Sequence, residues 1–202
     1  MRKFILALLA TVLLAPLHPT RAAAEAEGDA RIAQLHQEHP ELGFLLFDVT
    51  VLNDGKRVCS ANTVSLTSNT RKQAQVDVNP GSFIPSRRTR GALASLEPAV
   101  WTIGFVECSY GKYAGPFAKI RIEAGDIVNA GNLIVDVYTI RPRGLFQGAI
   151  RGAHATVEDL PAEAVESLQQ RAPATLAKAK RRYFEANADL SQVRRGEAPA
   201  KH

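Results

Sequence analysis

The chain has 202 residues, of which 46% are hydrophobic, and it carries a formal net charge of +5. Since a domain usually holds roughly 100–200 residues, this length predicts one domain with a sizeable core. The longest apolar run, Phe4 to Ala15, is too short for a membrane-spanning helix, which needs roughly 20 apolar residues.

The first segment, residues 1–24, has the layout of a cleaved secretory signal. Two cations open it, an apolar run follows, and Ala22–Ala24 precede the expected cleavage site. Cleavage there removes Arg2, Lys3 and Arg21, which lowers the net charge from +5 to +2. We therefore expect a periplasmic or secreted protein that has no nucleic-acid partner, because that compartment normally lacks nucleic acid.

Residues 25–42 are predicted to form an amino-terminal helical segment. Ile32, Leu35 and His39 recur in it at helical spacing, and Pro40 follows. Because proline cannot continue a helix, the helix is expected to end there.

From residue 43 to residue 157 the pattern predicts short strands separated by turns. Apolar and β-branched residues flank Asn53-Asp54-Gly55, which is typical of a hairpin turn. A strand from Ile127 is expected to pair with residues 132–140 through a turn at Gly131. Since no long helix separates the strands, the predicted fold is mainly β, an antiparallel β-sandwich with short flanking helices at the amino and carboxy ends.

Most charged side chains in this region are interpreted as solvated. Arg87, Arg88 and Arg90 lie in a polar stretch that is interpreted as an exposed loop. Asp48 and Asp136, like the other carboxylates of the strands, lack the spacing of a calcium loop and are expected to make the sheet faces soluble.

Residues 158–190 are predicted to form a helical tail. Asp159 is expected to cap a first helix entered through Pro161, and Pro173 to start a second helix that runs to about Asn187. The second helix would carry an apolar stripe flanked by cations: Leu176, Ala179, Tyr183 and Phe184. Such a stripe packs on the sandwich or lies on an anionic membrane, and residues 191–202 are predicted to be disordered.

Cys59 and Cys108 are the two cysteines of the chain, and both lie in predicted strands. In an oxidising compartment we expect a disulfide between them. On the chain-entropy model, closing a loop of about 50 residues stabilises a fold by roughly 4 kcal/mol. Two cysteines without a matching histidine cluster do not supply the four ligands of a zinc site, so no metal is expected.

The search for catalytic residues yields one histidine, His154, with Glu158 and Asp159 close in sequence. A histidine paired with a carboxylate is suited to act as a base, but no GxSxG nucleophile motif accompanies it. Phosphate-binding glycine loops are also missing from the sequence, so no nucleotide or other cofactor is expected. A hydrolase that uses His154 is therefore an alternative hypothesis, and no catalytic residue is assigned.

An aromatic segment directly after Cys108 is the predicted ligand-binding loop, with Tyr110, Lys112, Tyr113 and Phe117 as its contact residues. Anchored tyrosines offer rigid contact area to a sugar or a peptide. The alternative is that Tyr113 and Phe117 cover the sandwich as part of its core.

Three segments of the strand region carry a resemblance to known proteins: residues 94–103, 115–128 and 132–137. They resemble small prealbumin-like or carboxypeptidase-regulatory-like sandwich modules, in proteobacterial envelope proteins that have a signal peptide and a short helical tail. The resemblance covers roughly half of the chain and implies a sandwich fold, but it supplies no catalytic residue.

These observations lead to one functional hypothesis and two alternatives. We expect a non-enzymatic accessory or binding module of the cell envelope that contacts another protein or a cell-envelope glycan. The alternatives are the hydrolase that uses His154 and a peripheral membrane protein attached through its basic carboxy-terminal helix.

Overall fold

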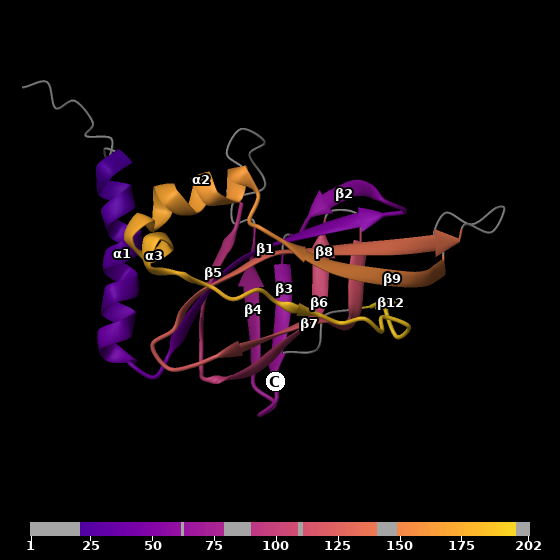
Figure 1. The fold of residues 1–202 in the computed structure, drawn as a ribbon, viewed down its shortest axis with the longest axis horizontal. Helices are drawn as coiled ribbons and strands as arrows, with labels where there is room; N and C mark the ends of the chain where they lie inside the picture. Colours follow the sequence, from indigo (N-terminus) through magenta and orange to yellow (C-terminus); the bar gives the residue numbers. More distant parts are fainter. Residues whose placement is uncertain (1–20, 62, 79–89, 109–110, 141–148, 197–202) are drawn as a thin grey trace, which may run out of the picture.

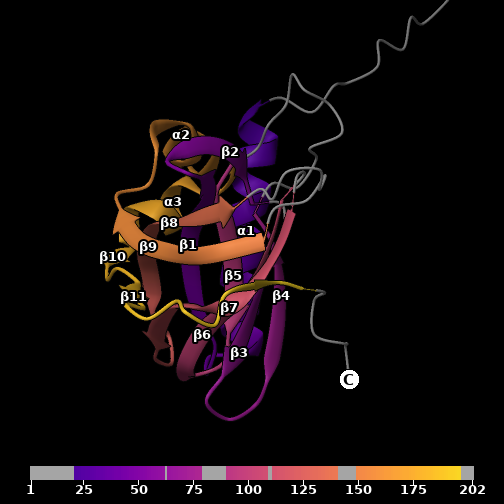
Figure 2. The same ribbon diagram turned by 90° about the vertical axis from the view of Figure 1, so that its right-hand side faces the viewer.

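Two β-sheets that pack face to face make up most of the protein (Figure 1 and Figure 2). The computed structural model describes residues 21–61, 63–78, 90–108, 111–140 and 149–196. The predicted β-sandwich with short flanking helices is confirmed. Residues 1–20 of the predicted signal peptide lie outside the described residues, and 21–24 begin the helix α1 (Arg21–Glu38), which forms where a helix is predicted.

The first sheet, sheet A, is built around two long strands that lie side by side, β1 (Gly43–Asn53) and β8 (Ile127–Ile140). Three strands pair with them in antiparallel fashion: β2 (Lys56–Ser60) and β5 (Ala92–Leu96) on β1, and β9 (Ala149–Glu158) on β8. The short β10 (Lys180–Arg181) also pairs with β8.

The pairing of β1 with β8 is parallel, and so is that of β10 with β8. Antiparallel pairing alone is predicted from the sequence, so these two pairs differ from that expectation. Parallel neighbours need a long connection between them. The chain between β1 and β8 supplies one, because it passes through the second sheet before it returns.

The second sheet, sheet B, is wholly antiparallel. Its four main strands follow the order β4, β3, β6, β7: β4 (Gln73–Asp77), β3 (Thr63–Ser68), β6 (Ala99–Cys108) and β7 (Gly111–Ile122). Two short strands from the end of the chain add to β7, namely β11 (Glu185–Ala186) and β12 (Arg194–Arg195).

Two glycine-containing segments that look alike as turn signals have different structures. Asp54 and Gly55 form the predicted hairpin turn between β1 and β2, with positive φ angles of 53° and 75°. Gly131 instead lies within the continuous strand β8, at a φ of 79°, where the register with β1 shifts. A Cβ at Gly131 would meet the carbonyl oxygen of Glu158 at 2.4 Å. The predicted hairpin through Gly131 is therefore wrong, because this glycine permits a bulge and not a turn.

The core lies between the two sheets. Alternate residues of β1 point into it and are fully buried: Leu45, Phe47, Val49 and Val51. Leu133, Val135 and Val137 of β8 continue this inner face, opposite Ile103, Ala118 and Ile120 of sheet B. This alternation is the pattern of a strand with one face in the core.

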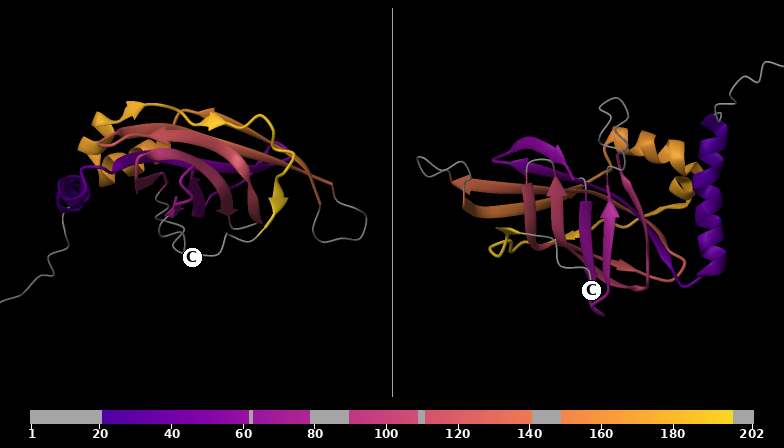
Figure 3. Two further views of the ribbon diagram at one scale, coloured as in Figure 1. Left: turned by 90° about the horizontal axis from the view of Figure 1, so that it is seen from below. Right: turned by 180° about the vertical axis from the view of Figure 1, so that it is seen from behind.

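The helices cover one end of the outer face of sheet A (Figure 3). Leu46 of β1 packs with residues of α2 (Ala162–Arg171), and Phe44 packs with Ile32 of α1 and with Ala172. Gly28 of α1 lies so close to the carbonyl group of Arg171 that a Cβ would meet its oxygen at 1.8 Å. None of the described helices is long and apolar enough to cross a membrane.

A buried ionic cluster lies where this helical cover ends. Asp48 of β1 is fully buried, and the side chain of Arg90 is only 7% exposed. Arg90 Nη2 donates to Asp48 Oδ2 at 2.5 Å and to Thr50 Oγ1 at 3.3 Å, and Arg90 Nη1 lies 3.3 Å from Glu163 Oε2 of α2. The prediction of a solvated Arg90 and a solubilising Asp48 is therefore wrong, because α2 covers this part of the sheet. Arg87 and Arg88 lie outside the described residues.

The first half of the predicted helical tail is present, although its cap differs. α2 ends at Arg171, as expected, but the residue before it is Pro161, whose carbonyl oxygen accepts hydrogen bonds from Ala164 and Val165. Asp159 binds Tyr183 and Arg181 in place of capping this helix.

The second half of the tail is not the predicted helix. α3 (Pro173–Lys178) has six residues, and the chain after it is an extended strap, residues 179–196, that joins the edges of both sheets. Phe184 is buried against Phe47, with the ring centroids 5.7 Å apart, whereas the next residue back, Tyr183, is 36% exposed. An extended chain puts these neighbours on opposite faces, while a helix keeps both on one side.

The end of the chain is also more ordered than predicted. Leu190 and Val193 are buried in the core, and β12 pairs with β7. The disorder predicted for residues 191–202 is therefore wrong for 191–196, while 197–202 lie outside the described residues.

Candidate functional site

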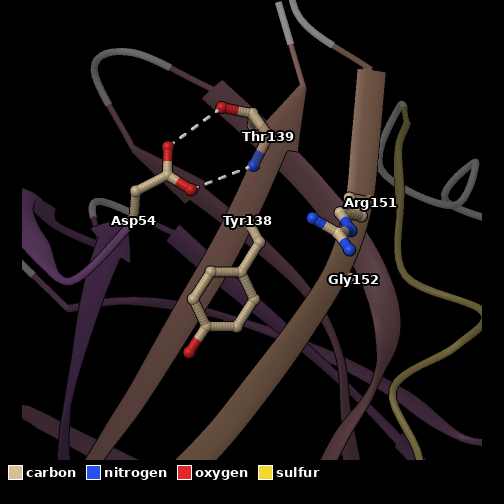
Figure 4. Close-up of a pocket in the computed structure, with 5 residues that line it drawn as sticks. All are labelled: Asp54, Tyr138, Thr139, Arg151 and Gly152. Carbon is tan, nitrogen blue, oxygen red and sulfur yellow. Dashed lines mark hydrogen bonds between the residues drawn. The ribbon is translucent and has the colours of Figure 1, made fainter.

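The open end of sheet A carries a hollow of about 370 Å³ (Figure 4), and this end lies away from the helices (Figure 1). Five residues line it, and we call the site the tyrosine hollow: Asp54, Tyr138, Thr139, Arg151 and Gly152. They come from the β1–β2 turn and from the neighbouring strands β8 and β9. The volume lies at the lower end of the roughly 300–1,000 Å³ that is typical of ligand sites.

The Asp54 side of the hollow is fastened to β8 by hydrogen bonds. Asp54 accepts two from Thr139, from its N–H and from its Oγ1, both at 3.3 Å. The Asp54 N–H in turn donates to the carbonyl oxygen of Val137 at 3.2 Å. The hairpin turn therefore holds its carboxylate at a fixed place beside the strand that carries Tyr138.

The opposite side of the hollow is formed by a bulge in β9. Tyr138 pairs with Gly152, but Thr139 pairs with Ile150, so Arg151 is an extra residue without a partner position in β8. A bulge re-aims the side chain of the extra residue and often lies next to a functional site. The guanidinium of Arg151 extends from β9 toward the space beside Tyr138 (Figure 4).

Tyr138 is the most exposed aromatic side chain of the described residues, at 40%. Its cross-strand neighbour, Gly152, has no side chain, and a Cβ built there would meet nothing within 4 Å. The charge of Asp136 raises the pKa of Tyr138 above its usual value, with further contributions from burial, a hydrogen bond to Asp136 and the charge of Asp54. The phenol therefore stays protonated at neutral pH.

Within the described chain, the charged side chains around the hollow do not form ion pairs with one another. Asp54 is held by Thr139, and Asp136 accepts a hydrogen bond from the N–H of Gly55 at 3.1 Å. Among the described residues, none forms an ion pair or a hydrogen bond with the Arg151 side chain. The site thus offers an uncovered aromatic ring, a cation without a partner in the described chain, and a fixed acceptor.

His154, the predicted base, is exposed on the same face of β9, two residues beyond Gly152. The register places it opposite Asp136 of β8, and not beside the carboxylates that follow it in sequence. Within the described chain, no three His, Cys, Asp or Glu side chains come together as metal ligands.

The predicted ligand-binding loop lies elsewhere, at the hairpin between β6 and β7. Tyr113 is only 4% exposed and Phe117 is fully buried, so the structure does not place these rings where a ligand can reach them. They belong to the core, which is the alternative considered from the sequence. Lys112 pairs with Glu107 at 3.2 Å, and Tyr110 lies outside the described residues.

The two cysteines lie on different sheets, Cys59 in β2 and Cys108 at the end of β6. Cys108 is 5% exposed, and the described residues include no free cysteine. Thr63 of β3, a few residues after Cys59, pairs with Glu107. The chain that follows Cys59 therefore passes next to the neighbour of Cys108. The disulfide between Cys59 and Cys108 remains a prediction, which this course of the chain supports.

Apart from the turn at Asp54, the sequence patterns do not identify the residues of the tyrosine hollow as a site. Tyr138 carries a usable signal, because it alternates with Val135 and Val137 and thus falls on the polar face of its strand. Arg151 carries no such signal, because strict alternation counted back from Ala155 and Ala153 would place it on the inner face of the strand. Only the bulge turns it outward.

Comparison of the chain with models of protein families, with curated proteins and with solved structures finds no match. The resemblance to prealbumin-like and carboxypeptidase-regulatory-like modules therefore stays a prediction.

Proposed function

We propose that this protein is a non-enzymatic binding module of the cell envelope that contacts a cell-envelope glycan through the tyrosine hollow. The observation that carries the proposal is the exposed ring of Tyr138, which Gly152 leaves uncovered beside the side chain of Arg151. The location, periplasmic or secreted, is part of the proposal and rests on the composition of residues 1–24.

A glycan fits the chemistry of the hollow better than a protein surface does. The apolar face of a sugar ring packs on an aromatic face, while its hydroxyl groups need fixed donors and acceptors around that face. Tyr138 supplies the ring, and Asp54 and Arg151 supply the polar groups at its margins. A protein interface usually buries a wider area, about 800 Å² per partner, and a single exposed tyrosine in a small hollow does not suggest one.

Two alternatives have less in their favour. The alternative of membrane attachment depends on an amphipathic carboxy-terminal helix, but residues 179–196 are an extended strap whose Arg181 and Arg182 pair with Asp159 and Asp126. Hydrolysis by His154 stays a prediction that rests on its register with Asp136 alone.

The proposal is tested by sedimentation of the purified protein with peptidoglycan sacculi. We expect the wild-type protein to sediment with the sacculi and Tyr138→Ala to remain in the supernatant, with affinity reduced about tenfold or more, because burying an aromatic ring against a sugar contributes roughly 1.4 kcal/mol or more. Val165→Ala is the matched control, because Val165 is equally exposed, at 40%, but lies on α2. If the wild type does not bind, or if Tyr138→Ala binds equally well, the proposal is wrong.

A further inference from the structure

Arg151 lines the tyrosine hollow only because of an irregularity in β9. The residues that follow it alternate regularly, with Ala153, Ala155 and Val157 toward the core and His154 toward solvent. In an unbroken strand this alternation would direct Arg151 to the apolar side, where a guanidinium without a partner is strongly unfavourable. The register shift between Tyr138 and Thr139 turns it to the outer face.

Four other arginines of the described chain are bound to an acceptor of this chain. Arg90 pairs with Asp48, Arg171 donates to the carbonyl oxygen of Gly91 at 2.6 Å, Arg181 pairs with Asp159, and Arg182 pairs with Asp126. These four contacts fix strands, helices and the strap to one another. Arg151 differs from them, because it lines a hollow and makes no ion pair with the described residues.

Two carboxylates of this end of the sheet already accept hydrogen bonds from the chain. Asp54 accepts two hydrogen bonds from Thr139, and Asp136 accepts one from Gly55 and one from Tyr138. Both therefore serve to fasten the β1–β2 turn and to orient the phenol. The guanidinium of Arg151, which extends toward the space beside Tyr138 (Figure 4), is thus available to a ligand in the hollow.

We infer that the ligand is an acidic glycan, in which a carboxylate borne by a sugar pairs with Arg151 while the ring of that sugar or of its neighbour packs on Tyr138. This inference rests on the proposed function and adds the chemical class of the ligand. A planar carboxylate matches the planar fork of a guanidinium, which binds it through two parallel hydrogen bonds. The lysines of the protein offer no such fork.

The test compares two forms of one glycan. The probes are peptidoglycan strands freed of their peptides, so that each lactyl group ends in a carboxylate, and the same strands with those carboxylates converted to methylamides. We expect the wild-type protein to bind the acidic strands about tenfold more tightly, and this preference to shrink in 0.5 M salt, where charges are largely screened.

The variants assign the preference to one side chain. Arg151→Gln is expected to bind both forms with the same affinity, and Arg151→Lys to keep only part of the preference, because it retains the charge without the fork. Arg121→Gln is the control, since Arg121 is an exposed arginine of β7 in the other sheet, and it should keep the full preference.

The outcomes separate this inference from the proposed function. If the wild type binds both forms equally while Tyr138→Ala binds neither, the glycan-binding proposal stands and the assignment of an acidic ligand is overturned. A preference that survives in Arg151→Gln overturns it as well. If neither form is bound by the wild type, both the inference and the function proposed for the hollow are wrong.

Discussion

The outer face of sheet A has two halves that share strands but differ in what covers them. In the half next to the helices, Phe44 and Leu46 of β1 lie under α1 and α2 and are at most 2% exposed. In the other half, Leu52 on the same face of β1 is only partly buried, and Tyr138 of β8 is exposed. The buried pair Asp48 and Arg90 marks the boundary between them.

This difference separates side chains that hold the fold from side chains that are available for a ligand. The covered half buries apolar surface, which stabilises the fold by about 25 cal/mol per Å². The open half stabilises the fold little, yet Asp54, Thr139 and the bulge at Arg151 hold its polar groups in place. One sheet face thus serves folding at one end and presents a site at the other.

The largest expected effect is at the boundary. Asp48→Ala leaves the buried guanidinium of Arg90 with the hydroxyl of Thr50 and the more distant, exposed carboxylate of Glu163, and we expect the free energy of unfolding to fall by about 3–5 kcal/mol. Urea unfolding followed by circular dichroism measures this change. The double variant Asp48→Leu with Arg90→Met should recover most of the loss, because apolar side chains of similar size need no partner. A loss below about 1 kcal/mol in Asp48→Ala would contradict the view of this pair as a buried, coupled boundary.

A matched pair of substitutions on β1 tests the two halves directly. Leu46→Ala removes a fully buried side chain from the contact with α2, and we expect a loss of about 2–5 kcal/mol. Leu52→Ala, on the same strand and face, should cost about 1 kcal/mol or less, because its side chain lies in the open half. Equal losses in urea unfolding would show that the open half is covered in solution.

The apolar, β-branched strands and the turns between them made the sandwich predictable from the sequence. Apolar alternation in β1 and β8 and the Asp54-Gly55 turn are local signals, and the structure follows them. The prediction of a helix to Asn187 is wrong, because Tyr183 and Phe184 suit either periodicity. The extended form pairs with the edges of both sheets and packs Phe184 against Phe47. Periodicity over so few residues does not decide between helix and strand.

The candidate site was less predictable for a related reason. Tyr113 and Phe117 are aromatic residues near a cysteine, a pattern that predicts a binding loop, but aromatic residues are buried more often than they bind ligands. Tyr138 and Arg151 come together only through pairing of β8 with β9 and a one-residue shift in it. A register shift of this kind depends on the whole sheet and leaves no mark in a local stretch of sequence.

The smallest expected effect concerns the helical cover itself, and it depends on pH. Asp29 of α1 accepts hydrogen bonds from the N–H groups of Ala174 and Thr175 at 2.8 and 3.0 Å, so it caps α3 from another helix. Burial raises the pKa of Asp29, but these hydrogen bonds, a further one from the Thr175 hydroxyl and the charge of Lys178 outweigh it, and the pKa is lowered below 3.8.

Because the pKa is lower in the folded protein, the ionised carboxylate stabilises the fold fully above the unfolded pKa, and this contribution is lost as the pH falls through the folded pKa. Asp29→Ala should therefore reduce the free energy of unfolding by about 1 kcal/mol at pH 7. Asp29→Asn, which keeps an acceptor but does not titrate, is the control, and its deficit relative to wild type should shrink as the pH is lowered from 6 to 3. A deficit that stays constant over this range in urea unfolding would show that the cap acts without the charge of Asp29, and that the covered half owes nothing to this carboxylate's ionisation.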